Sequence, residues 1–182
     1  RAVIDSLRPA TQELWLNLPL PEKRHFKQHL SRYWNVARHR MPAEVAAILD
    51  EMQASGRLEI LKGRLTDITH DGAKFVVKYK TTQASNNVEA DALVNCIGSE
   101  SSFSKVDSEF VRNLIARKHI RNDELDLGID ATPDGQVIGK TNHPSNVVYT
   151  LGTALKGILW ESTAIPEIRT QARTLALKLL AD

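Results

Sequence analysis

Two apolar runs that end in glycine decide the fold expected of this chain: Ala92-Leu93-Val94-Asn95-Cys96-Ile97-Gly98 and Asn146-Val147-Val148-Tyr149-Thr150-Leu151-Gly152. Neither run alternates polar and apolar residues, so each is predicted to be a strand covered on both faces. Glycine has no Cβ, so the backbone at Gly98 and Gly152 could approach a cofactor closely. In open α/β sheets ligands bind beyond the carboxyl ends of strands. The two glycine corners are therefore the first candidates for a binding site, although glycine after a strand often only turns the chain.

Helices are predicted to precede these runs. Apolar residues recur at helical spacing between residues 12 and 56. Pro21 suits a first helical turn, Pro42 interrupts the pattern, and Gly56 suits the position just after a helix. The segment is therefore predicted to form a helical hairpin with an apolar seam.

A short antiparallel meander is predicted to connect the hairpin to the first buried run. Asp71-Gly72 is a strong signal for a hairpin turn. Residues 58–61 and 74–81 have strand-like patterns, and residues 83–87 are predicted to be a polar loop. Cys96 lies inside the apolar run and is expected to be buried and unreactive.

The rest of the chain is predicted to alternate short elements. A helix is expected from Phe110 to about Lys118, strand residues at Val137-Ile138, and a last helix from about Ser162. Pro166 is tolerated in that helix because it lies in the first turn.

The composition is that of an ordinary globular protein and excludes several classes. The 182 residues carry 24 Lys+Arg and 22 Asp+Glu, a net charge of +2, which argues against a nucleic-acid-binding protein. A single cysteine excludes an internal disulfide and a cysteine-based zinc site. The sequence shows no signal peptide and no apolar run long enough to cross a bilayer. A cytoplasmic protein that contacts neither membrane nor nucleic acid is expected.

The motifs around the two glycines resemble those of flavoproteins with two dinucleotide-binding domains. Residues 90–98 are similar to their "AD-x-h-h-x-A-T-G" segment, and residues 146–153 to their late "h-Y-h-h-G-D" segment beside the ribityl chain. A closer resemblance is to the C-terminal part of bacterial FAD/NAD(P)-binding proteins of the YdhS-like group. It is carried by Trp34–Met41, residues 127–130 and the segment from Leu151-Gly152 through Gly157 to Arg169. The most specific piece is Trp160-Glu161-Ser162-Thr163-Ala164-Ile165-Pro166-Glu167-Ile168-Arg169. This resemblance covers most of residues 30–172.

The resemblance implies FAD as cofactor and NAD(P)H as a possible co-substrate. The residues that it places near the cofactor are Ile97, Gly98, Ser99, Gly152, Thr153, Gly157, Ile158 and Trp160. Most of them would act through backbone groups, and Trp160 would either stack near a flavin or cover the start of the last helix as a core residue. No residue is identified as an acid, base or nucleophile, and no metal site is expected.

Two departures from the family pattern shape the expectation. The sequence contains no G-x-G-x-x-G, the loop that holds the cofactor pyrophosphate in this superfamily, and it begins with Arg1 rather than Met. Thr153 replaces the acidic residue of the "G-D" motif and loses a charge-assisted hydrogen bond. The chain is therefore expected to be the C-terminal half of a longer protein whose N-terminal half binds the dinucleotide, and to bind FAD weakly or not at all by itself.

Basic and histidine side chains on the first long helix have a simpler explanation. Lys23, Arg24, Lys27, Arg32 and Arg38 occur there with His25, His29 and His39. A patch for nucleic acid or for NAD(P) phosphates is one interpretation, but a solvated helix face opposite the apolar stripe is preferred. His25 and His29 are spaced to share a metal, yet no third ligand accompanies them. Arg38-His39-Arg40 suits a helix end and, by the resemblance, would face the substrate or nicotinamide side.

The sequence and the resemblance together predict an α/β fold, namely a partial doubly wound, Rossmann-like FAD/NAD(P)-binding sheet with an antiparallel meander and an N-terminal helical hairpin. Residues 1–56 would form the hairpin and residues 57–182 the C-terminal part of the binding domain. The expected function is the C-terminal part of an FAD-dependent, NAD(P)H-linked oxidoreductase or monooxygenase of unknown substrate, inactive by itself. The alternatives are a non-catalytic module that binds a partner through the basic hairpin, and part of a reductase that binds NAD(P) alone.

Overall fold

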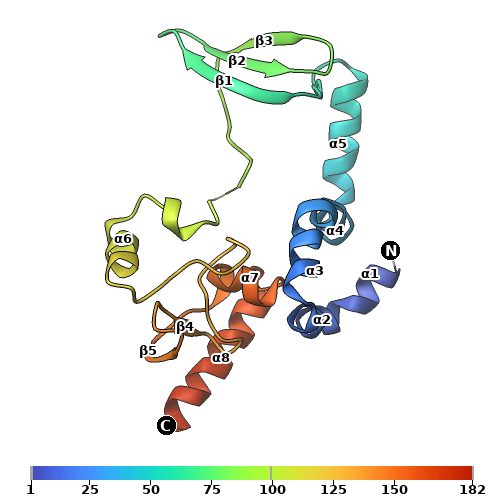
Figure 1. Cartoon of the computed structure of the whole chain (residues 1–182). Coiled ribbons are helices and arrows are strands. Elements are labelled where there is room, and N and C mark those ends of the chain that lie inside the picture. Colours follow the sequence, from blue (N-terminus) through green and yellow to red (C-terminus); the bar gives the residue numbers. More distant parts are fainter. Residues whose placement is uncertain (1, 99, 182) are drawn as a thin grey trace. The chain divides into compact units, whose positions relative to one another are not determined.

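A computed structural model describes residues 2–98 and 100–181 of the chain as a mixed α/β protein (Figure 1). Its strands form two small antiparallel sheets, one with the order β1-β2-β3 and one that pairs β4 with β5. The chain divides into two compact units, the first made of residues 1–40 and 99–182 and the second of residues 41–98. Among the described residues, no helix combines the length and the apolar character needed to span a bilayer.

The second unit contains one helix and the meander. Its elements are α5 (Ala43–Ala54), β1 (Arg64–His70), β2 (Phe75–Lys80) and β3 (Ser85–Ala90). The turn predicted at Asp71-Gly72 is confirmed: Asp71 Oδ1 accepts hydrogen bonds from the N–H groups of Ala73 and Lys74, both at 2.8 Å. These two bonds lower the pKa of Asp71, because they favour its charged form.

Two local predictions for the meander are wrong. Residues 58–61 form no strand, and β1 begins only at Arg64. The loop predicted at residues 83–87 is shorter: only residues 83 and 84 lie in the turn, since β3 begins at Ser85 and pairs along its whole length with β2. The turn is shorter than expected because Thr81 closes it, donating its N–H to the carbonyl of Ala84 at 2.9 Å. Pairing across the strands outweighs the polar character of this segment.

The buried strand predicted at Ala92–Ile97 is also wrong. The segment has no regular secondary structure and is exposed, with Val94 81% and Ile97 90% accessible. Cys96 is exposed as well, contrary to expectation. A side-chain turn interrupts the extended chain here, because Asn95 Oδ1 accepts the N–H of Ile97 at 3.1 Å. No strand pairs with the segment among the described residues, so the apolar run stays uncovered.

The N-terminal helices of the first unit follow one another closely. They are α1 (Ala2–Leu7), the 3₁₀ turn η1 (Arg8–Ala10), α2 (Thr11–Asn17), α3 (Leu20–His25), the π-helical turn η2 (Phe26–Leu30) and α4 (Ser31–Arg38). Helix after Pro21 and an end before Pro42 were predicted and are confirmed. The predicted partner helix of the hairpin, α5, belongs to the other unit.

A π-helical turn sets the face of this helix. In a regular α-helix Phe26 and Trp34, eight residues apart, would point about 80° away from each other at ~100° per residue. The wider turn at η2 takes up one extra residue and brings the two rings onto one face. Their centroids lie 6.3 Å apart in an edge-on arrangement.

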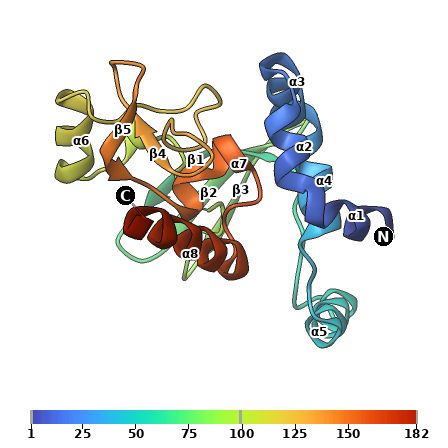
Figure 2. The same ribbon diagram turned by 90° about the horizontal axis from the view of Figure 1, so that it is seen from below.

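The remaining elements of the first unit build a small core around β4 and β5. They are η3 (Phe103–Lys105), α6 (Glu109–Ala116), β4 (Gln136–Ile138), β5 (Pro144–Tyr149), η4 (Gly152–Leu155), α7 (Lys156–Leu159) and α8 (Ile165–Ala181). Ile120, Ile129 and Val137 are buried together, and Val111, Leu114 and Ile115 of α6 pack against them. Figure 2 shows the β4 and β5 pair with α8 below it in that view. The helix near Phe110, the strand at Val137 and the last helix were all predicted and are confirmed.

The strand before Gly152 is only partly as expected. β5 ends at Tyr149 and pairs with β4 alone, so it is an edge strand and not a strand covered on both faces. Val147 is 81% exposed, whereas Val148 packs toward the small core. Successive side chains of a strand point to opposite faces, so the face with Val148 lies against the core and the face with Val147 is exposed.

The N-terminal helices pack with the C-terminal part of the chain, whereas the sequence predicted a boundary at residue 56. Trp15, Leu125 and Trp160 form a buried cluster against which Phe26 and Trp34 pack. Residues 1–40 thus belong with the C-terminal part of the chain, because their aromatic side chains share a core with it.

Candidate functional site

A strained turn at Trp160 forms the base of the candidate site. The carbonyl of Leu159 accepts the N–H of Glu161 at 2.7 Å, and Trp160 between them has φ 57° and ψ −69°. This is a γ-turn of the rare kind, which costs free energy in a residue with a large side chain. The turn ends α7 abruptly and directs Glu161 away from the core that holds Trp160.

Aromatic packing holds Trp160 in this conformation. Its ring centroid lies 4.8 Å from that of Trp15 and 5.0 Å from that of Phe26. Trp15 also donates its indole N–H to the carbonyl of Gly157 at 2.9 Å, which fixes α7 against α2. The packing offsets the strain of the turn, and it makes Trp160 a core residue, one of the two roles considered from the sequence.

Three side chains from the N-terminal helices hold Glu161. Gln12 donates its amide N–H to the Glu161 carbonyl at 2.6 Å, and Trp34 donates its indole N–H to Glu161 Oε1 at 2.8 Å. The Arg38 guanidinium lies 3.8 Å from Glu161 Oε2. The Arg38 and Glu161 side chains are 16% and 14% exposed, so this ion pair is mostly shielded from water and more strongly coupled than a surface pair.

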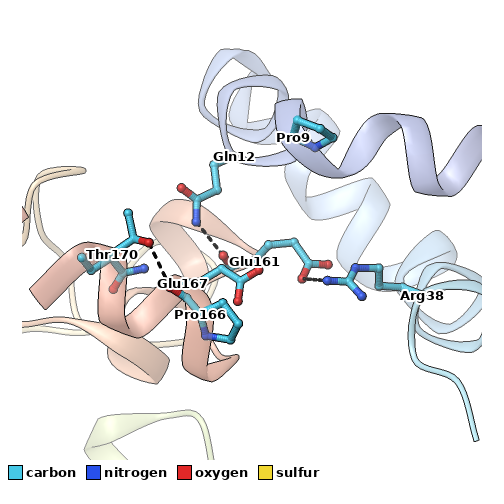
Figure 3. A pocket seen from close by; sticks show the side chains of 8 residues that line it. Pro9, Gln12, Arg38, Glu161, Pro166, Glu167 and Thr170 are labelled. Atoms are coloured by element: carbon cyan, nitrogen blue, oxygen red, sulfur yellow. Dashed lines mark hydrogen bonds and ion pairs between the residues drawn. The ribbon is translucent and has the colours of Figure 1, made fainter. Parts of the chain in front are cut away.

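A cavity of about 260 Å³ opens beside Glu161 (Figure 3). Gln12 from α2, Arg38 from α4 and Thr170 from α8 approach it from separate elements. The complete lining is Pro9, Gln12, Arg38, Glu161, Pro166, Glu167, Thr170 and Gln171. We call it the Glu161 cavity.

A second cavity of about 250 Å³ adjoins the first. The two share Gln12, Thr170 and Gln171. The second cavity is lined further by apolar side chains of the small core and α8, including Leu155, Leu159 and Leu175, and it reaches Thr150-Leu151 just before Gly152. Together the cavities run from the strained turn to the second glycine corner.

Gln171 connects that corner to both cavities. Gly152 has φ +74°, a conformation that favours glycine, and a Cβ there would lie 3.4 Å from Ile168. The Gly152 N–H donates to Gln171 Oε1 at 2.7 Å. Sequence reasoning found the glycine and singled out Arg38, but it missed Gln12 and Gln171 as cavity residues, because only the fold brings α2 and α8 together.

The other residues expected near a cofactor occupy different environments. Thr153 is exposed next to Gly152, and Ile158 is half-buried against the core of Ala131, Leu155 and Leu159. Gly157 is buried, and the Asp123 carboxylate fills the space where its Cβ would be. Ile97 is exposed and Gly98 adopts φ +94°, but both belong to the second unit. Ser99 lies outside the described residues.

Most of the basic side chains on the N-terminal helices make contacts within the first unit. Lys27 donates to the carbonyl of Leu125, and Lys23 lies over the Trp15 ring at 5.6 Å. Burial lowers the pKa of Lys23, and the charge of Glu124 opposes that shift. With Arg38 paired to Glu161, these cations support the fold and not a free basic patch.

A metal ion and a flavin each require more than these side chains provide. No group of three or more His, Cys, Asp or Glu side chains suited to a metal occurs in the described part of the chain. The His25 and His29 rings lie tilted against each other with centroids 4.8 Å apart, as expected from their spacing on the helix. Each cavity is smaller than the roughly 300–1,000 Å³ of sites that enclose drug-sized ligands, and FAD is larger still, so neither cavity can enclose FAD.

Comparison of the chain with protein-family models, with curated proteins and with solved structures found no match.

Proposed function

We propose that this chain is the C-terminal part of an FAD-dependent, NAD(P)H-linked oxidoreductase or monooxygenase and contributes one wall of its flavin and substrate site. Gly152, Thr153 and the turn through Ile158 and Trp160 would lie on the flavin side. The flavin would supply the redox chemistry, and the protein would bind and orient it.

One observation carries this proposal: the N-terminal helices wall cavities that reach the second glycine corner. Gln12 and Arg38 line the Glu161 cavity, and Gln171 in the same wall binds the N–H of Gly152. A module that bound a partner through its basic helices would instead keep those cations free at the surface. Lys27 and Arg38 are engaged in contacts with the C-terminal part of the chain, which favours the flavoprotein proposal.

A second observation supports the expected partial sheet. The apolar segment Ala92–Ile97 is uncovered and ends at Gly98, which has φ +94°. An exposed apolar run of this kind is suited to pairing with a further strand. We propose that an N-terminal dinucleotide-binding half supplies that strand. The sheet formed by the two halves would then have the doubly wound arrangement.

The decisive experiment is purification of the complete gene product that contains this chain. We expect a yellow protein whose visible spectrum is that of bound flavin, which releases FAD on denaturation and is reduced by NADH or NADPH. The 182-residue chain by itself should bind FAD weakly or not at all in a fluorescence titration. A complete protein that is colourless and does not take up added FAD would overturn the proposal.

A pair of glycine variants sharpens the test. Gly152→Ala in the complete protein adds a strained side chain next to Ile168 and should weaken FAD binding. Gly72→Ala is the control, because Gly72 also has a positive φ, +98°, but lies in the meander turn with nothing within 4 Å of a new Cβ. Equal FAD dissociation constants for the two variants would contradict the placement of Gly152 beside the flavin.

A further inference from the structure

The Glu161 cavity has two buried hydrogen-bond donors without partners among the described residues, Arg38 Nε and Gln171 Nε2. Buried polar groups in folded proteins nearly always have a partner, which is another protein group, an ordered water or a ligand. Two such donors in the wall of one cavity indicate that something with acceptor oxygens belongs there.

Neighbouring contacts hold both donors in place. Gln171 Oε1 accepts the N–H of Gly152, so the other end of the same amide must be the NH₂ group. The end of the Arg38 guanidinium is held 3.8 Å from Glu161 Oε2, which leaves Nε for another acceptor. Both orientations therefore follow from hydrogen-bonding requirements.

The charges of the lining decide between an anionic and a neutral ligand. Arg38 is the one positive side chain of the lining, whereas Glu161 and Glu167 are both negative. The positive charge is already paired with Glu161, so the lining has no further cation to balance a phosphate or carboxylate. A neutral carbonyl satisfies the two donors without adding an unbalanced charge.

The carboxylate of Glu161 offers an acceptor for a donor on the ligand. Oε1 receives the Trp34 N–H at 2.8 Å, but the contact of Oε2 with Arg38 is 3.8 Å, too long for a good hydrogen bond. A ligand N–H would complete the coordination of Oε2. A primary carboxamide carries both a carbonyl acceptor and N–H donors in one uncharged group.

We propose that the Glu161 cavity binds the primary carboxamide of a small neutral molecule, with its carbonyl toward Arg38 Nε and Gln171 Nε2 and its amide N–H toward Glu161. This proposal rests on the contacts and charges of the cavity and does not depend on a flavin. Both an aliphatic amide and the nicotinamide ring of a dinucleotide carry this group, and their shared chemistry is what the cavity would recognise.

The test is an NMR titration of the ¹⁵N-labelled 182-residue chain with nicotinamide, nicotinate and propionamide. The signals followed are the Arg38 Nε–H, the Gln171 NH₂ and the Trp34 indole N–H. Nicotinamide should shift them saturably with a Kd of about 1–10 mM, as expected for so small a ligand. Nicotinate has the same shape but a carboxylate in place of the amide, and it should bind at least about tenfold more weakly.

Propionamide distinguishes the two sources of the carboxamide. Saturable binding of propionamide as well as nicotinamide supports recognition of the amide group itself, and binding of nicotinamide alone supports an amide carried on an aromatic ring. Nicotinate that binds as tightly as nicotinamide would overturn the proposal. Absence of any saturable shift with either amide would also overturn it, since only water would then complete the two donors.

Variants then locate the binding. Gln171→Glu keeps an acceptor for Gly152 but removes the NH₂ group, and it should weaken nicotinamide binding about tenfold. Gln28→Leu is the control, because Gln28 is an exposed residue of η2 outside the cavity lining. Equal affinities of the two variants would place the ligand elsewhere. If Gln171→Glu fails to fold, the comparison of nicotinamide with nicotinate on the natural chain still decides.

Discussion

The indole N–H of Trp34 donates a 2.8 Å hydrogen bond to the carboxylate of Glu161, which lies 127 residues further along the chain. Trp34 ends the aromatic face of the N-terminal helices, and Glu161 follows the strained turn at Trp160. The bond therefore joins the helical segment to the one place in the first unit where a buried tryptophan has a positive φ.

Trp34→Phe should destabilise the first unit by about 1–2 kcal/mol, because the half-buried Glu161 carboxylate loses a donor while most of the ring packing remains. Urea denaturation followed by circular dichroism measures the change. Tyr33→Phe is the matched control, since Tyr33 is exposed and its hydroxyl only accepts a hydrogen bond from Arg32. Equal stabilities of the two variants would mean that the bond to Glu161 contributes nothing.

Gly157→Ala should cost about 1–3 kcal/mol of stability, because the new methyl group meets the Asp123 carboxylate in a packed region. Asp123→Ala alone should also destabilise, since Asp123 accepts the N–H groups of Leu125 and Leu127 at 2.7 and 2.9 Å. In the double variant the methyl group has room, so the two effects should couple by at least about 0.5 kcal/mol. Strictly additive effects in a denaturation cycle would contradict the close approach of Gly157 to Asp123.

The ion pair of Lys178 with Asp134 should make stability depend on pH. The hydrogen bond from Lys178, and after it the one from Thr132, lowers the pKa of Asp134. A carboxyl with a lowered pKa in the folded state contributes stability above its unfolded pKa of about 3.9, and the contribution is lost as pH falls through the folded value. Both side chains are about a third or more exposed, so the effect at pH 7 should stay below about 1 kcal/mol.

Lys178→Met measures this contribution. The variant should be less stable than the natural chain at pH 7, and the difference should shrink as pH falls below about 4. Lys140→Met, at an exposed lysine, serves as the control. A difference between Lys178→Met and the natural chain that is unchanged down to the lowest pH would show that Asp134 is not the partner responsible.

Cys96 should react quickly with a thiol reagent in the 182-residue chain, because it is exposed in an irregular segment. In the complete gene product the proposed further strand would cover the Ala92–Ile97 segment, and the reaction should slow at least about tenfold, as expected when access depends on local opening. Measurement of both rates under native conditions tests the proposed sheet independently of any flavin. Equal rates would argue against that strand.

Sequence reasoning succeeded where one or a few adjacent residues determine the structure. Asp71-Gly72 specifies its turn through the aspartate side chain and the glycine conformation, and both are observed. Pro166 marks the first turn of α8, and the apolar spacing after Ser108 predicts α6. Such signals depend on local chemistry, which the sequence shows directly.

Sequence reasoning failed where neighbours distant in sequence decide the outcome. The run Ala92–Ile97 looks like a buried strand, but it becomes one only if a partner strand lies beside it, and none does among the described residues. Gln12 and Gln171 look like ordinary helix residues until α2 and α8 meet at the Glu161 cavity. Gly152 could be identified from the sequence because it follows an apolar run. The polar side chains Gln12 and Gln171 show no such pattern in the sequence.

The π-helical turn at Phe26–Leu30 has a consequence for tracing the ancestry of this chain. Trp34 lies eight positions after Phe26. Because of the π-helical turn, the rotation about the helix axis between the two residues is nearly that of seven positions in a regular α-helix. A homologue with one residue fewer between these aromatics could present the same face with an uninterrupted helix. Alignments with such homologues should therefore carry a single-position gap within this turn, and forcing them into register without it would mismatch either the phenylalanine or the tryptophan.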